Sequence, residues 1–469
     1  MPLWSDIAAE IADFRRRIRD VSVLPDATPE SLRAELEPKY RFDRPVPLES
    51  LTADVMRLLR THQVHVTSPR YFGLFNPQVR EAGIVADTLA ALYNLQLAVW
   101  SHSPAANEME RLALRALATR IGYDPDGMLA QFTSGGAEAN LCAALCALAH
   151  RFPAWAEEGA AGLGTRPAIY LSSESHHSFV KIAKMTGLGT TSVREAPVTA
   201  DLKLDPVALE ALIEANRSAG WSPLLIVGTA GTTAAGIIDP LRDLAAVAAR
   251  TGAWFHADAA WGGGALMSDA LRPHLDGIAL ADSVTWDAHK WLSVPMGGGM
   301  FFCRHPETVR HAFAAVHSYM PKETPGGTVD NFQVTPQWSR RATGLKVFMS
   351  LAELGVDGYG KLVDHQAEMG RLLRAKLTDA GWTLVADSPL PTVCFTHPEI
   401  EVGKVSIDDV IARIYAHRQT WISPVLLANR TRALRACITS YETEAGDLDA
   451  LIGELETARA GAHGQGGPL

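Results

Sequence analysis

Between about residue 84 and residue 303, short apolar runs alternate with helical stretches, and this alternation limits the possible folds more than any other feature. Several of the runs are separated by amphipathic patterns of helical length, for example at 138–150, 206–219 and 240–250. Strands that alternate with helices predict an α/β domain with a largely parallel sheet. The expected strands are 129–133, 168–172, 224–229, 254–258, 283–286 and 299–303.

The two ends of the chain follow different patterns. Residues 1 to about 65 contain amphipathic helical stretches at 6–19 and 48–61 with little apolar content to form a core. We therefore expect a helical arm that packs on another domain or on a partner subunit. After about residue 346 a long helix is expected, followed by a smaller α+β domain. Its expected strands lie near 382–385, 391–396 and 433–439.

Two segments lack regular patterns. Residues 318–338 contain three prolines and two adjacent glycines, which predicts a long surface loop of the kind that often forms a lid. The tail at 461–469 is glycine-rich, and we expect it to be disordered.

Composition excludes several classes of protein. The 469 residues carry a net charge of -9 without a block of basic residues, which argues against nucleic acid and anionic membranes as partners. No apolar run approaches the roughly 20 residues that a membrane span needs, and the first residues lack a signal-peptide pattern. Five cysteines form no CxxC pair, and Cys142 and Cys146 have the spacing of helix packing. We expect a cytoplasmic enzyme without a bound metal.

An acid and a lysine occur in two neighbouring apolar segments. Asp258 lies in the stretch HADAAWGGG, and Lys290 lies in TWDAHKW between two tryptophans. Desolvation favours a neutral lysine amine, which can form a Schiff base with an aldehyde. An acid beneath the same ring can hold a pyridine nitrogen protonated. For either residue alone, a plain strand acid or a surface lysine is the better interpretation, but the pair favours pyridoxal phosphate.

Three further segments agree with this interpretation, although each is weak evidence by itself. The turn TSGGAEAN at 133–140 follows an expected strand and opens a helix, so its backbone N–H groups can approach an anion. His176 and His177 follow the next expected strand, and one imidazole could cover an aromatic ring. The segment 228–233 ends in two hydroxyl residues. Ordinary turn chemistry would explain each segment equally well.

With these motifs in order, the chain resembles the group II pyridoxal-phosphate-dependent amino acid decarboxylases. That family includes aromatic-L-amino-acid, glutamate and cysteine sulfinate decarboxylases, and the likeness runs from about Ser68 to Tyr441. It implies a fold-type I pyridoxal-phosphate-dependent transferase fold, with a mixed, mostly parallel seven-stranded sheet in the large domain. The implied division is a helical arm over 1–75, a cofactor-binding α/β domain over 76–350 and a small α+β domain over 351–469. It also implies a homodimer in which the arm wraps the partner.

The resemblance assigns roles residue by residue. Lys290 matches the lysine of the internal aldimine, Asp258 the partner of the pyridine nitrogen, and Ala260 the small residue beneath the ring. His177, rather than His176, matches the stacking imidazole. The remaining cofactor contacts that it implies are Ser134, Gly135, Gly136, Ala137 and His289 at the phosphate and Thr233 nearby. The implied substrate contacts are Arg435 for the α-carboxylate and Phe75 for the side chain.

The implied reaction is decarboxylation of an L-amino acid to its amine and carbon dioxide, through a Lys290 aldimine and a quinonoid. An aromatic substrate is slightly favoured, and an acidic one such as glutamate is the alternative. Many relatives carry a loop tyrosine that protonates the quinonoid, where this chain has Asn331 or Phe332 unless Tyr319 replaces it. Without that donor, related enzymes produce an aldehyde by coupled oxidative deamination. A carbon–carbon lyase and a catalytically silent cofactor-binding protein are the rival classes.

Two positions near the expected phosphate depart from many relatives. Ala137 stands where a serine hydroxyl is common, so backbone N–H groups must contribute more. Asp287 stands where several relatives have asparagine, and a carboxylate beside a phosphate dianion is unfavourable unless it turns away or is screened.

Overall fold

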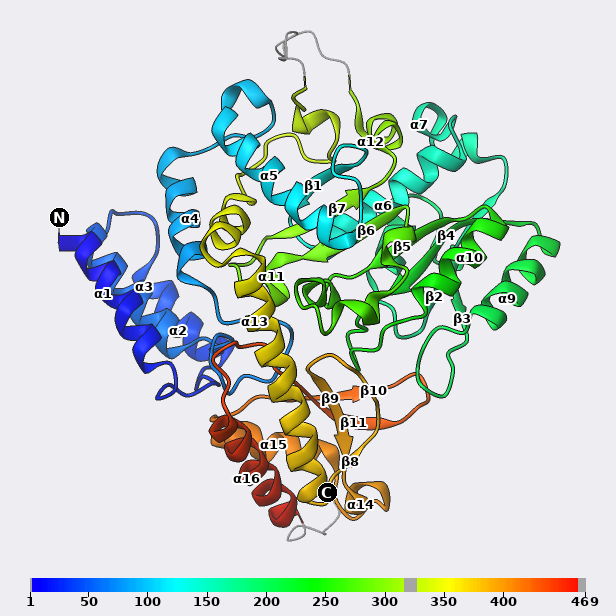
Figure 1. Ribbon diagram of the computed structural model, residues 1–469. Coiled ribbons are helices and arrows are strands. Elements are labelled where there is room, and N and C mark those ends of the chain that lie inside the picture. The colour runs from blue at the N-terminus through cyan, green and yellow to red at the C-terminus, as the bar shows by residue number, and fades with distance from the viewer. Residues whose placement is uncertain (1, 316–326, 463–469) are drawn as a thin grey trace.

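The computed structural model describes residues 2–315 and 327–462, which form two sheets with helices around them (Figure 1). The larger sheet has seven strands in the order β1-β7-β6-β5-β4-β2-β3. β7 runs antiparallel to β1 and β6, and the other neighbouring pairs are parallel. The expected mixed, mostly parallel seven-stranded sheet is confirmed. Its strands are β1 (Leu129–Thr133), β2 (Arg166–Ser172), β3 (Val193–Ala196), β4 (Trp221–Thr229), β5 (Trp254–Asp258), β6 (Ser283–Asp287) and β7 (Gly299–Cys303).

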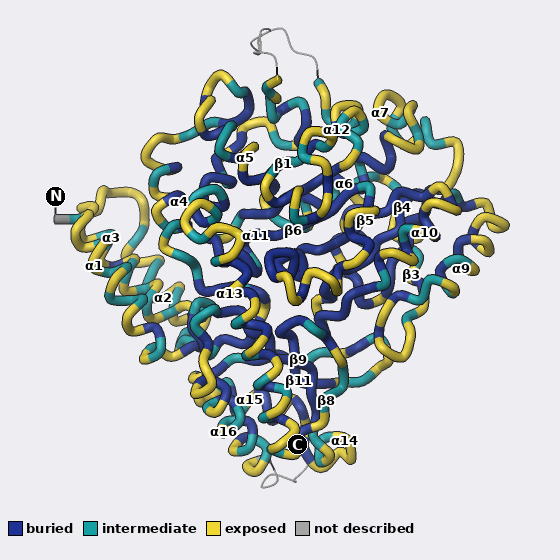
Figure 2. Tube along the Cα trace, viewed as in Figure 1, coloured by how far each residue is buried: buried dark blue, intermediate teal, exposed yellow. Residues whose placement is uncertain are grey.

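The two faces of this sheet carry separate apolar cores, because successive side chains of a strand point to opposite faces. Leu225 and Val227 belong to one core, whereas Ile226 belongs to the other. The first core is covered by α6 (Gly136–Arg151), α8 (Ser178–Met185) and α12 (Pro306–Phe313). The second is covered by α5 (Pro104–Ile121), α9 (Pro206–Ser218) and α10 (Leu241–Thr251). Figure 2 shows the sheet as a continuous buried layer.

The smaller sheet is antiparallel throughout, in the order β10-β11-β9-β8. The helix α13 (Leu345–Asp379) runs from the large sheet to the small one and is interrupted at Gly355, where φ is 64° (Figure 1). This α+β unit matches the expectation for the C-terminal part. Its other elements are β8 (Thr383–Leu384), β9 (Thr392–Thr396), β10 (Ser423–Leu426), β11 (Arg432–Cys437), α14 (Pro398–Glu401), α15 (Ile407–His417) and α16 (Ala445–Ala462).

The N-terminal helices lie at one side of the molecule (Figure 1). They are α1 (Pro2–Arg17), α2 (Pro29–Lys39) and α3 (Leu48–Thr61), and α4 (Glu81–Tyr93) follows them. α2 buries none of its residues. Ion pairs join Arg60 to Glu10 and Arg15 to Glu81, so polar contacts hold much of this arm in place. Two short helices, α7 (Trp155–Glu158) and α11 (Ala288–Trp291), complete the α-helices of the described residues.

The division at residues 75 and 350 stays a proposal. Phe72, before the first boundary, is fully buried in the core of the small sheet. α13 continues through the second boundary. Among the helices that the structure describes, none is long and apolar enough to cross a membrane.

The expected loop at 318–338 is present over its described residues, 327–338, but three of its residues are buried. Phe332, Val334 and Thr335 are at most 5% exposed. The side chain of Asn331 explains this burial, because its Nδ2 donates to the carbonyl of Leu97 and to Oδ1 of Asn107, both at 2.7 Å. Residues 316–326, which include Tyr319, and the tail 463–469 lie outside the described residues.

Candidate active site

A cavity of about 370 Å³ lies where β1, β4, β5 and β6 end, so residues that are distant in sequence meet there. This edge, at the carboxyl ends of parallel strands, is the usual ligand site of α/β sheets. The lining residues are Ser134, Gly135, Gly136, Ala137, Glu138, Asn140, His176, Thr229, Gly231, Thr233, Asp258, Ala260, Trp261, Asp287, His289, Lys290 and Met296.

Asp258 is the last residue of β5 and is 4% exposed. Its Oδ1 accepts a hydrogen bond from the backbone N–H of Ala260 at 3.1 Å, and its Oδ2 accepts one from Nδ2 of Asn140 at 2.8 Å. Two donors at a buried carboxylate favour its ionised form. The side chain thus presents a fixed negative charge at the cavity.

Lys290 belongs to the single turn α11, directly after β6. Its Nζ lies 3.1 Å from Oδ2 of Asp287, which is 2% exposed. Oδ2 of Asp287 also lies 3.7 Å from Nε2 of His289. The carboxylate that was expected to be unfavourable is therefore turned toward the amine of Lys290, which can screen its charge.

The turn at 134–137 brings backbone amides to the same cavity. α6 begins at Gly136 and its N-cap residue, Gly135, makes no side-chain cap hydrogen bond, which leaves the amides of the first helical turn and the helix dipole available to an anion. The N–H of Ser134 is already bonded, because it donates to Oε2 of Glu138 at 2.7 Å. A Cβ at Gly136 would lie 2.8 Å from Oδ2 of Asp287, so only glycine fits this approach. His289 lies beside the turn, and desolvation lowers the pKa of its imidazole.

The structure differs from the sequence-based choice between the two histidines. His176 lines the cavity, whereas His177 does not. Nδ1 of His176 accepts a hydrogen bond from the N–H of Ser178 at 3.2 Å, which orients the ring. Desolvation lowers the pKa of His176, and the charges of Asp258 and Lys290 also act on it. The residues before α8 form a turn, so only one of the two adjacent side chains belongs to the lining, and which histidine covers the ring stays a prediction.

Phe75 and Arg435 pack behind Lys290, and neither belongs to the residues that line the cavity. The Phe75 ring centroid lies 4.7 Å from Cζ of Arg435, 5.5 Å from Nζ of Lys290 and 4.5 Å from the ring of Trp261. Phe75 has a φ of 44°, a conformation that bulky residues adopt at some energetic cost and that often marks functional sites.

The guanidinium of Arg435 is 1% exposed and held by backbone carbonyls. Its Nε donates to the carbonyls of Thr233 and Ala234 at 3.0 and 3.1 Å, and its Nη1 donates to that of Gly73 at 2.9 Å. Its Nη2 has no hydrogen-bond partner among the described residues. A buried cation with a free donor is suited to bind a carboxylate.

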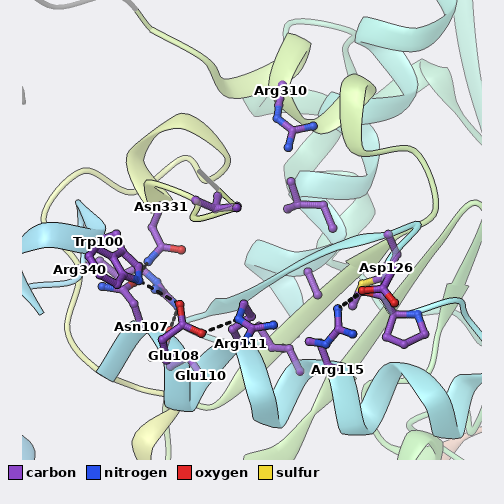
Figure 3. A pocket seen from close by; sticks show the side chains of 17 residues that line it. Trp100, Asn107, Glu108, Glu110, Arg111, Arg115, Asp126, Arg310, Asn331 and Arg340 are labelled. Atoms are coloured by element: carbon purple, nitrogen blue, oxygen red, sulfur yellow. Dashed lines mark hydrogen bonds and ion pairs between the residues drawn. The ribbon is translucent and has the colours of Figure 1, made fainter. Parts of the chain in front are cut away.

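Asn331 lines a different cavity of about 350 Å³, close to Arg340 and Glu110 (Figure 3). Nη2 of Arg340 donates to Oε2 of Glu110 at 2.6 Å, and both side chains are at most 5% exposed. Within one protomer, neither Asn331 nor Phe332 belongs to the lining around Lys290.

Sequence reasoning gave no role to Asn140, although it lies in the quoted motif at 133–140. The signal was available, because Asn140 lies one helical turn after Gly136 and so occupies the same side of α6. Trp261 was quoted as well; its ring stacks on Trp291 at 4.7 Å and supports Phe75 from behind.

The residues present fit pyridoxal phosphate. A buried carboxylate, a lysine amine, an imidazole and an uncapped helix N-terminus line one cavity, and these groups complement a pyridine nitrogen, an aldehyde, an aromatic ring and a phosphate. The free Nη2 of Arg435 adds a donor that nothing in the described residues satisfies.

Comparisons with known proteins agree with this chemistry. Residues 29–397 match the model of the pyridoxal-dependent decarboxylase conserved domain. The chain is 33% identical to a tyrosine decarboxylase of Oryza sativa subsp. japonica, over 82% of this chain and 74% of the relative. It is 29% identical to the cysteine sulfinic acid decarboxylase of Mus musculus, over 84% and 83% of the two chains. The crystal structure of mouse CSAD superposes with a TM-score of 0.90 at 25% identity, over 98% of each chain.

Proposed function

This chain belongs to the pyridoxal-dependent decarboxylases, which are carboxy-lyases of amino acids, and we propose that its preferred substrate is an aromatic L-amino acid. The observation that supports this proposal is the contact of the Phe75 ring with both Arg435 and Lys290, directly behind the lysine of the cavity. The products of the proposed reaction are the corresponding amine and carbon dioxide.

Pyridoxal phosphate is the cofactor of this family; when bound, it supplies an aldehyde for an amine and a protonated ring that accepts the electrons of a breaking Cα bond. We assign Lys290 to the aldehyde and Asp258 to the ring nitrogen. The turn 134–137 and His289 are assigned to the phosphate, with Thr233 and Ala260 beside the ring. The imidazole that covers the ring is assigned to His176, since His177 is absent from the cavity lining.

Lys290 must lose a proton before its amine can act as a nucleophile. Oδ2 of Asp287, 3.1 Å from Nζ, is the nearest carboxylate oxygen that can take that proton. The same contact keeps the amine paired when it is charged. In this proposal Asp287 therefore controls the protonation of Lys290.

Arg435 is assigned to the substrate α-carboxylate. Its Nε and Nη1 are fixed by three backbone carbonyls, so the free Nη2 has a defined direction. A guanidinium that is already ordered loses little conformational entropy when it binds. This anchor orients the α-carboxylate, while the Phe75 ring offers its face to an apolar or aromatic side chain.

Two alternatives rest on specific observations. The likeness to a cysteine sulfinic acid decarboxylase supports an acidic substrate, for which Arg435 would bind an anionic group. The position of Asn331 and Phe332 outside the cavity lining supports the aldehyde alternative, because neither supplies an acid to Cα within the protomer. That reaction would consume dioxygen and water and release an aldehyde, carbon dioxide, ammonia and hydrogen peroxide.

We further propose a cytoplasmic homodimer. The N-terminal arm exposes Trp4, Phe42, Leu48 and Leu59, which a partner subunit would cover. All five cysteines are free, as is usual in a reducing compartment.

The test is incubation of the enzyme and pyridoxal phosphate with each common L-amino acid and with cysteine sulfinate. Amine, carbon dioxide, aldehyde, ammonia and peroxide are each quantified, with Lys290→Ala as the inactive control. An aromatic substrate with the highest kcat/KM, giving amine and carbon dioxide, is the expected result. A faster acidic substrate would reject the aromatic preference, and equal amounts of aldehyde and peroxide would reject simple decarboxylation.

A further inference from the structure

One face of β5 carries a line of polar side chains that leads away from the cavity. Trp254, His256 and Asp258 alternate with Phe255 and Ala257, so the first three share a face of the sheet. In the neighbouring strand β6, Ser283 is paired with His256. α6 covers this face and brings Asn140 to it.

These side chains form a continuous chain of hydrogen bonds. Nε1 of Trp254 lies 2.8 Å from Oγ of Ser283, which lies 2.9 Å from Nδ1 of His256. Nε2 of His256 lies 3.0 Å from Oδ1 of Asn140, whose Nδ2 donates to Oδ2 of Asp258 at 2.8 Å. All five side chains are at most 4% exposed, so water does not compete for these bonds.

The chemistry of the two ends, together with a neutral imidazole at His256, fixes the direction of every bond. The indole of Trp254 can only donate, and the ionised carboxylate of Asp258 can only accept. Asn140 must therefore turn its amide group to Asp258 and its carbonyl oxygen to His256. Nε2 of His256 must then carry the proton, while Nδ1 accepts from the hydroxyl of Ser283.

His256 is a neutral ring because it is fully buried, and a neutral ring supplies one donor and one acceptor. Burial of the ring lowers its pKa to about 4, against the opposing charge of Asp258. Oγ1 of Thr285 lies 3.3 Å from Nε2 and can share the same proton. The neutral ring thus links Ser283 to Asn140 by hydrogen bonds and adds no second charge near Asp258.

We propose that His256 and Asn140 are positioning residues that hold Asp258 ionised and aimed at the pyridine nitrogen of the cofactor. The inference rests on the proposed role of Asp258 as the partner of that nitrogen. Each donor in the chain points toward the carboxylate, so the bonds reinforce one another and favour its negative charge. Loss of Asn140 leaves Asp258 with the N–H of Ala260 as its remaining donor in the described residues, and loss of His256 leaves the carbonyl oxygen of Asn140 without this donor.

The experiment compares equilibrium binding of pyridoxal phosphate with that of 1-deazapyridoxal phosphate, in which carbon replaces the ring nitrogen. The ratio of the two dissociation constants reports the contact between Asp258 and the nitrogen and cancels general effects on the pocket. We expect wild-type enzyme to bind the natural cofactor more tightly. Asn140→Leu and His256→Leu should reduce that ratio at least about tenfold, as expected for one lost hydrogen bond to a charged group.

His256→Gln is the rescue variant, because its amide can donate to Asn140 and accept from Ser283; it should keep most of the ratio. Should the leucine variants fail to fold, Ser283→Ala removes one oxygen and should still reduce the ratio. Ser192→Ala is its matched control, since Ser192 is equally buried but bonds to the carbonyl of Gly189 and should leave the ratio unchanged.

The possible outcomes distinguish the role proposed for His256 and Asn140 from the role proposed for Asp258. Equal binding of both compounds by wild-type enzyme would refute the role of Asp258 and the inference with it. A clear preference in wild-type enzyme that all chain variants retain would refute the inference alone. Variants that weaken both compounds equally would assign the chain a purely structural role, which also overturns the inference.

Discussion

His256 makes the stability of the folded chain depend on pH, because its imidazole is fully buried. Desolvation lowers its pKa from 6.5 to about 4. Below pH 6.5 the imidazole of His256 therefore binds a proton in the unfolded chain, whereas in the folded chain it stays neutral until the pH approaches 4. The contribution to stability is complete above pH 6.5 and is lost as the pH falls toward 4. The full shift in the pKa of His256 corresponds to about 3 kcal/mol in the free energy of unfolding, and about 2 kcal/mol of this is lost between pH 7 and pH 5.

The neighbours of His256 allow this effect to be isolated. Asp258 is the charged group that acts on the ring, and it favours the protonated form. Asn140 and Ser283 are neutral, as is Thr285. His256→Gln preserves one donor and one acceptor but cannot titrate in this range.

Urea unfolding of wild-type protein and of His256→Gln, at pH 7 and pH 5 and at one protein concentration, measures the effect. Wild-type protein should lose about 2 kcal/mol more than the variant over this interval. His274→Gln, at an exposed histidine, should retain the wild-type pH dependence. Equal losses in wild-type protein and His256→Gln would refute the reasoning, because the folded state would then accept the proton.

Four further substitutions test the site and the buried ion pair of Arg340. His176→Ala should weaken equilibrium binding of pyridoxal phosphate about tenfold, as expected for a lost stacking contact. His177→Ala should leave that binding nearly unchanged. A larger loss of binding in His177→Ala than in His176→Ala would favour His177 as the stacking residue. Glu110→Gln should lower the free energy of unfolding, measured by urea titration, by about 3 kcal/mol. The reason is that the guanidinium of Arg340 is buried and would lose its anionic partner. A change in the free energy of unfolding near zero would contradict this prediction. Arg435→Lys should raise KM at least about tenfold with a smaller change in kcat, and an unchanged KM would remove Arg435 from substrate binding.

The central sheet could be predicted because its inner strands are buried on both faces and read as continuous apolar runs. The edge strand β3, Val-Arg-Glu-Ala, was missed because it pairs on one side only and carries charges. β10 was missed for a related reason, since it contains Pro424 and pairs only with β11. The position of loop residues such as Phe332 depends on contacts with Ala98 and Val99, which no local pattern encodes.

The candidate site was predictable where a motif carries its own chemistry. Asp258, Lys290 and the turn at 134–137 follow different strands, and the sheet brings them to one cavity as expected. Their roles stay predictions that the binding experiments test. The choice between His176 and His177 depends on how a turn directs two adjacent side chains, which counting residues does not capture.

The departure at Asp287 shows why charge must be judged for the whole cavity. Taken by itself, a carboxylate near a phosphate site is unfavourable, yet here its Oδ2 contacts Nζ of Lys290 and faces the imidazole of His289. Asp258 draws its donors from Asn140 and Ala260, so the two carboxylates do not compete for the same partners. An asparagine could not pair with Lys290 as a counter-charge, so the contact between Oδ2 and Nζ depends on the carboxylate at this position. This chain therefore stabilises its two negative charges by different means, one with neutral donors and the other with a cation.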